Sequence, residues 1–169
     1  MKKVINIIKI TTLMMAAVIL SGTISFAAGN TTAEEYFLEA SEVYNSRHFA
    51  ESIILYSKAI ESKPDFVEAY FGRGSAFGMI GDRDRAMADF DRILQINPNE
   101  AQAYYNKGLL YEMFFEREKA IEEFEKFIEH ATFQTPPESL REAKKKINRI
   151  KTELEKRKEA EQEMKEKQE

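Results

Sequence analysis

The chain repeats itself every 34 residues. A shift of that length places Pro64 on Pro98 and aligns further positions through three successive units, always in the order small, aromatic, small, aromatic. A repeat of this length is typical of one supersecondary unit that cannot bury its apolar side alone, so three units are expected to stack. The aligned positions are Tyr36, Tyr70 and Tyr104; Ala40, Gly74 and Gly108; Val43, Phe77 and Tyr111; Ser52, Ala86 and Ala120; and Tyr56, Phe90 and Phe124.

Each unit has the spacing of two helices. In the first half of unit two, Tyr70, Gly74 and Phe77 lie four and three residues apart, on one helical face, and the second half repeats this spacing from Ala86 to Ile93. A small residue on each face lets the two helices approach closely, and the aromatic neighbour fills the groove beside the crossing. A glycine–aspartate pair separates the halves, and a proline ends the second helix. The expected helices are 33–45, 49–62, 67–80, 83–96, 101–114 and 117–130.

These columns resemble the tetratricopeptide repeat family. The match runs from about Ala33 to Gln134 and is best in unit two. Arg73 and Lys107 occupy a column where the family usually has Leu, and Phe127 and Thr132 depart from the pattern in the last unit, as a terminal repeat does. The resemblance implies an all-α fold, a right-handed α-solenoid of three helical hairpins. The three units are then 33–66, 67–100 and 101–134.

The C-terminal part, 135–169, is expected to add a capping helix. Thr135 to Glu138 reads as a capping box with a proline at the first helical position. From Glu155 onward the sequence alternates Lys and Glu, which predicts a charged and frayed tail. The apolar stripe before it covers the flank of unit three, or pairs with a second copy as a coiled coil, although two heptads are short for that. The stripe consists of Leu140, Ala143, Ile147, Ile150 and Leu154.

The N-terminal segment, 1–27, has the pattern of a secretory signal peptide. Three lysines precede a nearly continuous apolar run, and Ser25-Phe26-Ala27 offers small residues for cleavage. The alternative is an uncleaved anchor, because residues 10–28 are almost long enough to span a bilayer. We expect an extracytoplasmic protein of a bacterial cell envelope, periplasmic or secreted, that touches the membrane only if this segment is retained.

The remaining sequence is acidic and offers no catalytic pattern. The formal charge of −4 becomes −7 without the three N-terminal lysines, so nucleic acid is not an expected partner. The chain has no Cys, and its two histidines, His48 and His130, fall at a turn and at a helix end. Asp82 and its acidic neighbours lack the Gly and Glu of a calcium loop. We expect no metal, no cofactor and no enzymatic activity.

The family resemblance places the first helix of each unit on an inner surface that binds peptides. Family members that grip a terminal carboxylate use Lys there, and the corresponding positions hold Phe37 and Gln102, so that mode is not expected. Phe37, Phe71 and Tyr105 form an aromatic row that either lines the groove or packs between units. The candidate groove residues are Phe37, Ser41, Tyr44, Phe71, Ser75, Met79, Tyr105, Asn106, Leu109 and Met113.

The sequence therefore predicts a binding scaffold or adaptor of the cell envelope. Its partner is expected to be a protein or peptide with an apolar or amphipathic segment, bound by a monomer. Two alternatives remain open at this point. One is a structural spacer that associates with itself through the C-terminal helix, and the other is an accessory solute-binding protein.

Overall fold

In the computed structural model, which describes residues 31–167, the described chain is helical and contains no strand. The six helices expected from the repeat are present, and each begins and ends within one residue of the predicted position. The seventh is much longer than the others. The helices are α2 (Ala33–Asn45), α3 (Phe49–Ser62), α4 (Val67–Met79), α5 (Arg83–Ile96), α6 (Ala101–Met113), α7 (Arg117–Glu129) and α8 (Pro137–Glu166).

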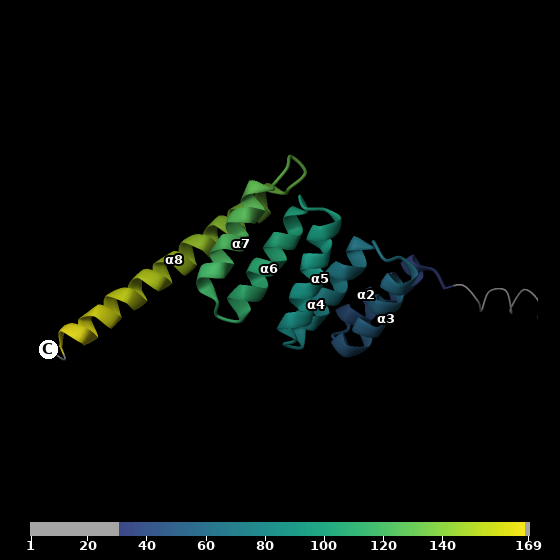
Figure 1. Ribbon diagram of the computed structural model, residues 1–169, viewed down its shortest axis with the longest axis horizontal. Coiled ribbons are helices and arrows are strands. Elements are labelled where there is room, and N and C mark those ends of the chain that lie inside the picture. Colours follow the sequence, from purple (N-terminus) through teal and green to yellow (C-terminus); the bar gives the residue numbers. More distant parts are fainter. Residues whose placement is uncertain (1–30, 168–169) are drawn as a thin grey trace, which may run out of the picture.

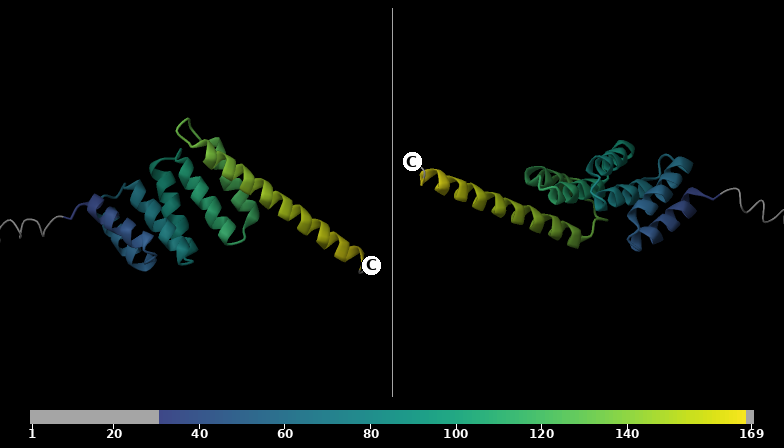
Figure 2. Two further views of the ribbon diagram at one scale, coloured as in Figure 1. Left: turned by 180° about the vertical axis from the view of Figure 1, so that it is seen from behind. Right: turned by 90° about the horizontal axis from the view of Figure 1, so that it is seen from below.

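Consecutive helices form three antiparallel hairpins that stack side by side as a solenoid (Figure 1). Within the stack, α2 also contacts α4, and α4 contacts α6, so the first helices form one continuous face. Helix α8 lies against α7, and its C-terminal half projects beyond the stack (Figures 1 and 2). The predicted fold, three hairpins and a capping helix, is confirmed.

The repeated small residues are where the two helices of a hairpin meet. Ala40, Gly74 and Gly108 are buried at this crossing. The second helix of each hairpin also carries a buried aromatic residue in one repeated column. In unit three, a Cβ atom added to Gly108 would lie 2.7 Å from the ring of Phe124. The aromatic ring thus occupies the space that a larger residue would need, which explains why the small and aromatic columns recur together.

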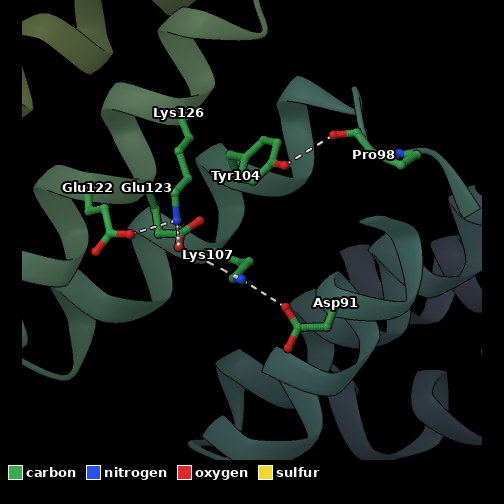
Figure 3. Close-up of polar contacts among 7 residues, drawn as sticks. All are labelled: Asp91, Pro98, Tyr104, Lys107, Glu122, Glu123 and Lys126. Atoms are coloured by element: carbon green, nitrogen blue, oxygen red, sulfur yellow. Dashed lines mark hydrogen bonds and ion pairs between the residues drawn. The ribbon is translucent and has the colours of Figure 1, made fainter. Parts of the chain in front are cut away.

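The proline and tyrosine columns are joined by a hydrogen bond. Tyr70 donates its hydroxyl to the carbonyl of Pro64 at 3.2 Å, and Tyr104 donates to the carbonyl of Pro98 at 3.1 Å (Figure 3). The proline stands where one unit ends, and the tyrosine stands in the first helix of the next. The bond therefore fixes the linker against the hairpin that follows it.

The turn inside each hairpin holds one residue in the left-handed backbone region. These residues are 34 positions apart: Arg47 with φ 64°, Gly81 with φ 81° and Phe115 with φ 61°. At each turn, the next amide donates to the carbonyl five residues earlier, as in a Schellman motif. Only Gly81 adopts this conformation without a steric penalty, because it has no Cβ atom.

We expect Phe115→Gly to stabilise the protein by roughly 0.5–1 kcal/mol, because glycine relieves the left-handed strain. The Phe115 side chain is 75% exposed and loses little packing when removed. Urea denaturation followed by circular dichroism measures the change. The converse substitution, Gly81→Ala, should destabilise the same turn of the neighbouring unit by about 1 kcal/mol. A loss of stability in Phe115→Gly would contradict the strain argument.

The two positive residues that replace the family's Leu each connect three helices. Arg73 of α4 donates two hydrogen bonds to Asp89 of α5, at 2.9 and 2.7 Å, and one to the Ser57 hydroxyl of α3 at 3.1 Å. One repeat later, Lys107 of α6 lies 2.8 Å from Asp91 of α5. Lys107 also lies 3.8 Å from Glu123 of α7 (Figure 3). Each cation therefore ties its own hairpin to the preceding one.

Helix α8 covers the end of the stack, as expected from its stripe. Ile147 and Ile150 are buried in one cluster with Ala120 and Phe124 of α7. Ion pairs flank this cluster, including Arg117 to Glu153 at 3.2 Å and Lys151 to Glu125 at 2.9 Å. Because the stripe is buried against its own chain, it does not offer the same surface to a second copy.

The predicted capping box at Thr135 is wrong. Helix α8 begins at Pro137, and a residue before proline is driven to an extended conformation, so Pro136 takes the capping position with ψ 132°. The Thr135 hydroxyl instead accepts from the amide of Thr132 at 3.0 Å. A capping box does begin the first hairpin, where Thr32 and Glu35 exchange side-chain hydrogen bonds with each other's amides.

Two further expectations concern the ends of the chain. The tail is helical as far as Glu166, and its side chains are exposed beyond Leu154. The predicted signal peptide, 1–27, lies outside the described residues. Within residues 31–167, no helix combines the length and the hydropathy that a membrane span requires.

Candidate functional site

The face formed by α2, α4 and α6 carries an apolar hollow of about 210 Å³. Its floor and walls come from all three hairpins, with Tyr44 from α2, residues of α4 and residues of α6. Two of the lining residues, Gly74 and Gly78, are glycines. We call this site the apolar hollow, and it is lined by Tyr44, Gly74, Ser75, Gly78, Met79, Phe90, Asn106, Leu109, Leu110 and Met113.

A second hollow of about 320 Å³ lies on the same face between the first two hairpins. Four of its lining residues are aromatic, and one is a carboxylate. We call it the aromatic hollow, and it is lined by Phe37, Tyr44, Tyr56, Glu68, Phe71, Gly72 and Ser75. Tyr44 and Ser75 line both hollows, so the two adjoin and together form one groove.

Most of the predicted groove residues are brought together in this groove. Met79, Leu109 and Met113 retain 49, 36 and 46% of their surface although they line the apolar hollow, so this patch is both recessed and accessible. Helix α8 contributes no lining residue to either hollow. The predicted residues that line the groove are Phe37, Tyr44, Phe71, Ser75, Met79, Asn106, Leu109 and Met113.

Two predicted residues, Ser41 and Tyr105, line neither hollow. The Ser41 hydroxyl donates to the carbonyl of Phe37 at 2.8 Å and lies 3.3 Å from the Tyr56 hydroxyl, so its polar group is already occupied. The Tyr105 ring packs against two rings of α7, Phe124 at 5.4 Å and Phe127 at 5.1 Å. The structure therefore gives both residues a packing role.

The sequence left open whether the aromatic row lines the groove or packs between units, and in the structure each ring packs against a ring of the second helix of its own hairpin. Phe37 packs on Tyr56 and Phe66, with ring centroids 5.9 and 5.2 Å apart, and Phe71 packs on Phe90 at 6.4 Å. Both nevertheless remain half-buried and line the aromatic hollow. The third member, Tyr105, packs on the rings of α7. The row thus packs within the hairpins along its whole length and opens to the groove in units one and two.

Charge on the inner face is entirely negative. Three glutamates, Glu34, Glu68 and Glu112, and no Lys or Arg stand at the inner-surface positions implied by the family resemblance. These positions are Glu34, Phe37, Ser41, Tyr44, Asn45, Glu68, Phe71, Ser75, Gly78, Met79, Gln102, Tyr105, Leu109, Glu112 and Met113. Lys63 pairs with Glu34 at 3.2 Å. Glu112 is held by two cations of α8, by Lys146 at 3.0 Å and by an arginine one turn further along. Glu112 is thus used to dock α8, whereas Glu68 faces the aromatic hollow.

Glu68 is the one charged residue among those that line the aromatic hollow, and the others are uncharged. Burial raises the pKa of the Tyr56 hydroxyl, although its contact with Ser41 acts in the opposite direction. Tyr56 therefore stays protonated at neutral pH. The ring faces carry partial negative charge, which adds to the field of Glu68.

The lining residues that are absent from the sequence-based candidates are Glu68, which is exposed, and residues that are half-buried or buried: Tyr56, Gly72, Gly74, Gly78, Phe90 and Leu110. Tyr56 and Phe90 belong to the repeated core columns, and Tyr56 also lines the aromatic hollow while Phe90 lines the apolar hollow. Gly72 matters because a Cβ atom there would lie 2.3 Å from the Tyr56 ring. Gly78 is different: a Cβ atom would meet Leu110 at an ordinary 3.5 Å. The absence of a side chain at Gly78 therefore opens the hollow and is not required by packing.

Neither histidine takes part in the groove. The His130 ring stacks on Tyr104 at 4.8 Å, and His48 lies 4.0 Å from Glu51 across one helical turn. Across the part of the chain from 31 to 167, no three His, Asp or Glu side chains lie close enough together to hold a metal ion.

Solved structures show the same fold. The TPR2B domain of yeast Sti1, solved in complex with pHsp70, is 21% identical, with a TM-score of 0.66 over 72% of this chain and 97% of that chain. The first TPR of Spaghetti (RPAP3), bound to the HSP90 peptide SRMEEVD, is 19% identical, with a TM-score of 0.62 over 73% and 93%. YrrB, a TPR protein with an unusual peptide-binding site, is 25% identical, with a TM-score of 0.61 over 71% and 60%.

No curated protein sequence matches the chain. Two family models do match: one tetratricopeptide repeat model covers residues 37–101 and a second covers 101–129. Together they span more than half of the chain and meet at the boundary between units two and three. The protein belongs to the tetratricopeptide repeat family.

Proposed function

We propose that this protein is a peptide-binding adaptor that holds a segment of another protein in the groove of α2, α4 and α6. The observation that carries the proposal is the apolar hollow, in which Met79, Leu109 and Met113 stay accessible. Fold stability alone would favour burying these side chains. Among similar structures of this fold, the Spaghetti domain holds an HSP90 peptide, and the Sti1 domain is in complex with pHsp70. A recessed apolar patch rimmed by polar residues is typical of a protein-docking site.

The chemistry of the hollow favours an apolar side chain as the inserted group. Methionine is flexible and polarisable, so the two Met side chains can adapt to anchors of different shape. Ser75 and Asn106 line the hollow, and the Ser75 hydroxyl and the Asn106 amide nitrogen can donate to the backbone or side chains of a bound segment, while the Asn106 oxygen accepts from Gln102 at 3.1 Å. A segment with apolar residues on one side, either extended or helical, fits this arrangement.

The cell envelope is the location that we propose for this activity. The support is the N-terminal sequence, in which lysines precede an apolar run and small residues. An adaptor exported by this signal would recruit or position other exported proteins. We expect a monomer, because the apolar stripe of α8 is buried against α7.

A matched pair of double variants tests the groove. Met79→Gln with Leu109→Gln places amides in the apolar hollow, whereas Ile80→Gln with Ile54→Gln makes the same change at exposed positions, 48% and 59% accessible, outside both hollows. Peptides selected from a displayed library on the native protein should bind the groove variant at least about tenfold more weakly, a loss of about 1.4 kcal/mol. The control variant should bind them as the native protein does.

Isothermal titration calorimetry of the selected peptides against the three proteins measures the difference. Thermal unfolding checks that both double variants remain folded. If the selected peptides bind the groove variant and the native protein equally, the groove is not the binding site. If selection yields no peptide that binds the native protein, the proposed activity itself is wrong.

A further inference from the structure

We infer that the aromatic hollow is a subsite for a cationic side chain, so that the bound segment carries a Lys or Arg next to its apolar anchor. The inference rests on the proposed peptide-binding function and adds the chemical class of the partner. It comes from the composition of the hollow, which is open to solvent and lined by Phe37, Tyr44, Tyr56 and Phe71 together with the carboxylate of Glu68.

Aromatic faces bind cations because the ring quadrupole presents negative charge to them. Several rings around one space, with a carboxylate at the edge, are an arrangement that holds ammonium and guanidinium groups. An apolar side chain would also fit between the rings, but it would gain nothing from Glu68. The volume of about 320 Å³ is sufficient for the end of a lysine or arginine side chain.

Glu68 is the acid of the inner face whose charge remains for a partner. Glu34 is paired with Lys63, and Glu112 is paired with Lys146 and Arg149 of α8. The salt bridges formed among residues 31–167 do not include Glu68. A bound segment with a Lys or Arg would form with Glu68 the kind of ion pair that Glu34 and Glu112 form with cations of this chain.

The position of the hollow sets the spacing on the partner. The two hollows adjoin at Tyr44 and Ser75, so a cation in one and an apolar side chain in the other must be neighbours on the bound segment. On a helix, neighbours on one face are three or four residues apart. An acidic segment is disfavoured, because no Lys or Arg lies among the lining residues of either hollow.

A double-mutant cycle with a peptide from the displayed library tests the subsite. The probe is the tightest peptide whose binding depends on Met79 and Leu109, together with copies in which each of its basic residues in turn becomes Gln. On the native protein, one of these changes should weaken binding about tenfold, and on Glu68→Gln the same change should weaken it about twofold or less. Glu68 is exposed, so Glu68→Gln leaves the fold intact.

Glu118→Gln is the matched control, because Glu118 is an exposed residue of α7 outside both hollows and its replacement changes the net charge equally. It should keep the tenfold effect. Phe71→Leu removes one ring face and should reduce the effect to about threefold. Because each effect is a ratio of two affinities for one protein sample, a partly unfolded fraction cancels.

The outcomes separate the subsite from the groove. A groove-dependent peptide that has no basic residue, or whose basic residues matter equally on native protein and Glu68→Gln, overturns the cation subsite and leaves the proposed function standing. A tightest peptide with acidic residues beside its apolar anchor overturns the subsite as well. A library that yields no groove-dependent peptide overturns both.

Discussion

Replacing Arg73 by leucine should lower the free energy of unfolding by about 3 kcal/mol, although leucine is the residue expected at this position from the family resemblance. The Arg73 guanidinium makes a two-bond pair with Asp89, whose side chain is only 6% exposed. Arg73→Leu would leave that carboxylate buried without its partner. Urea denaturation at neutral pH measures the loss.

The double variant Arg73→Leu with Asp89→Leu should recover most of this stability. Replacing a buried ion pair by apolar residues of similar volume is often neutral, whereas removing one partner is costly. Leucine already occurs in the Asp89 column, at Leu55 in unit one, where the Arg73 column holds Glu39. If the double variant is as unstable as Arg73→Leu, the stranded carboxylate is not the cause of the loss.

The cost of Arg73→Leu should also depend on pH. Burial raises the pKa of the Asp89 carboxyl, and Arg73 opposes that shift, so the pKa rises further when Arg73 is removed. A carboxyl whose folded-state pKa is raised destabilises the fold above that pKa and ceases to do so once it is protonated. The deficit of the variant relative to the native protein should therefore shrink as the pH falls from neutral toward the ordinary Asp range.

Gly108→Ala should destabilise the protein by about 2 kcal/mol, even though alanine is the better helix former. The new methyl group would lie 2.7 Å from the Phe124 ring, which is fully buried and cannot move aside without disturbing the cluster beneath α8. Overpacking of this kind forces backbone or rotamer strain. Thermal and urea unfolding both report the change.

Gly78→Ala is the matched control, because it makes the same change in the adjacent first helix. Its methyl group would meet only ordinary contacts in the apolar hollow, so the gain in helix propensity should stabilise the protein by about 0.5–1 kcal/mol. The two variants should thus differ by about 3 kcal/mol in opposite directions. Equal effects would show that the tight helix crossing at Gly108 does not limit the sequence there.

The periodicity predicted the hairpins closely, because the features that set them are local. Helix bounds follow from the spacing of apolar residues and from turn residues, and both are legible in one sequence. The capping helix was recognised from its stripe for the same reason. The predicted start of this helix was wrong because Thr135 and Glu138 satisfy the capping pattern. Pro137 instead forces the backbone of Pro136 into an extended conformation, so the helix begins at Pro137.

Contacts between helices far apart in the sequence were harder to predict. Arg73 and Lys107 stand out in the sequence as departures from the family pattern, but their partners lie sixteen residues away, on another helix. In the groove, the family resemblance orders the inner-surface positions, and eight of the ten candidate residues line the two hollows. Tyr105 lines neither hollow, because its ring packs on Phe127, the large residue that replaces a small one in the last unit.

The apolar hollow takes residues from all three hairpins, with Tyr44 from the first, Met79 from the second and Met113 from the third. In a linear array, a terminal unit can open while its neighbours stay folded. A bound segment that contacts all three units opposes such partial opening, because the first hairpin cannot unfold without losing its contacts with the segment. By thermodynamic linkage, occupancy therefore makes unfolding of the array more nearly all-or-none.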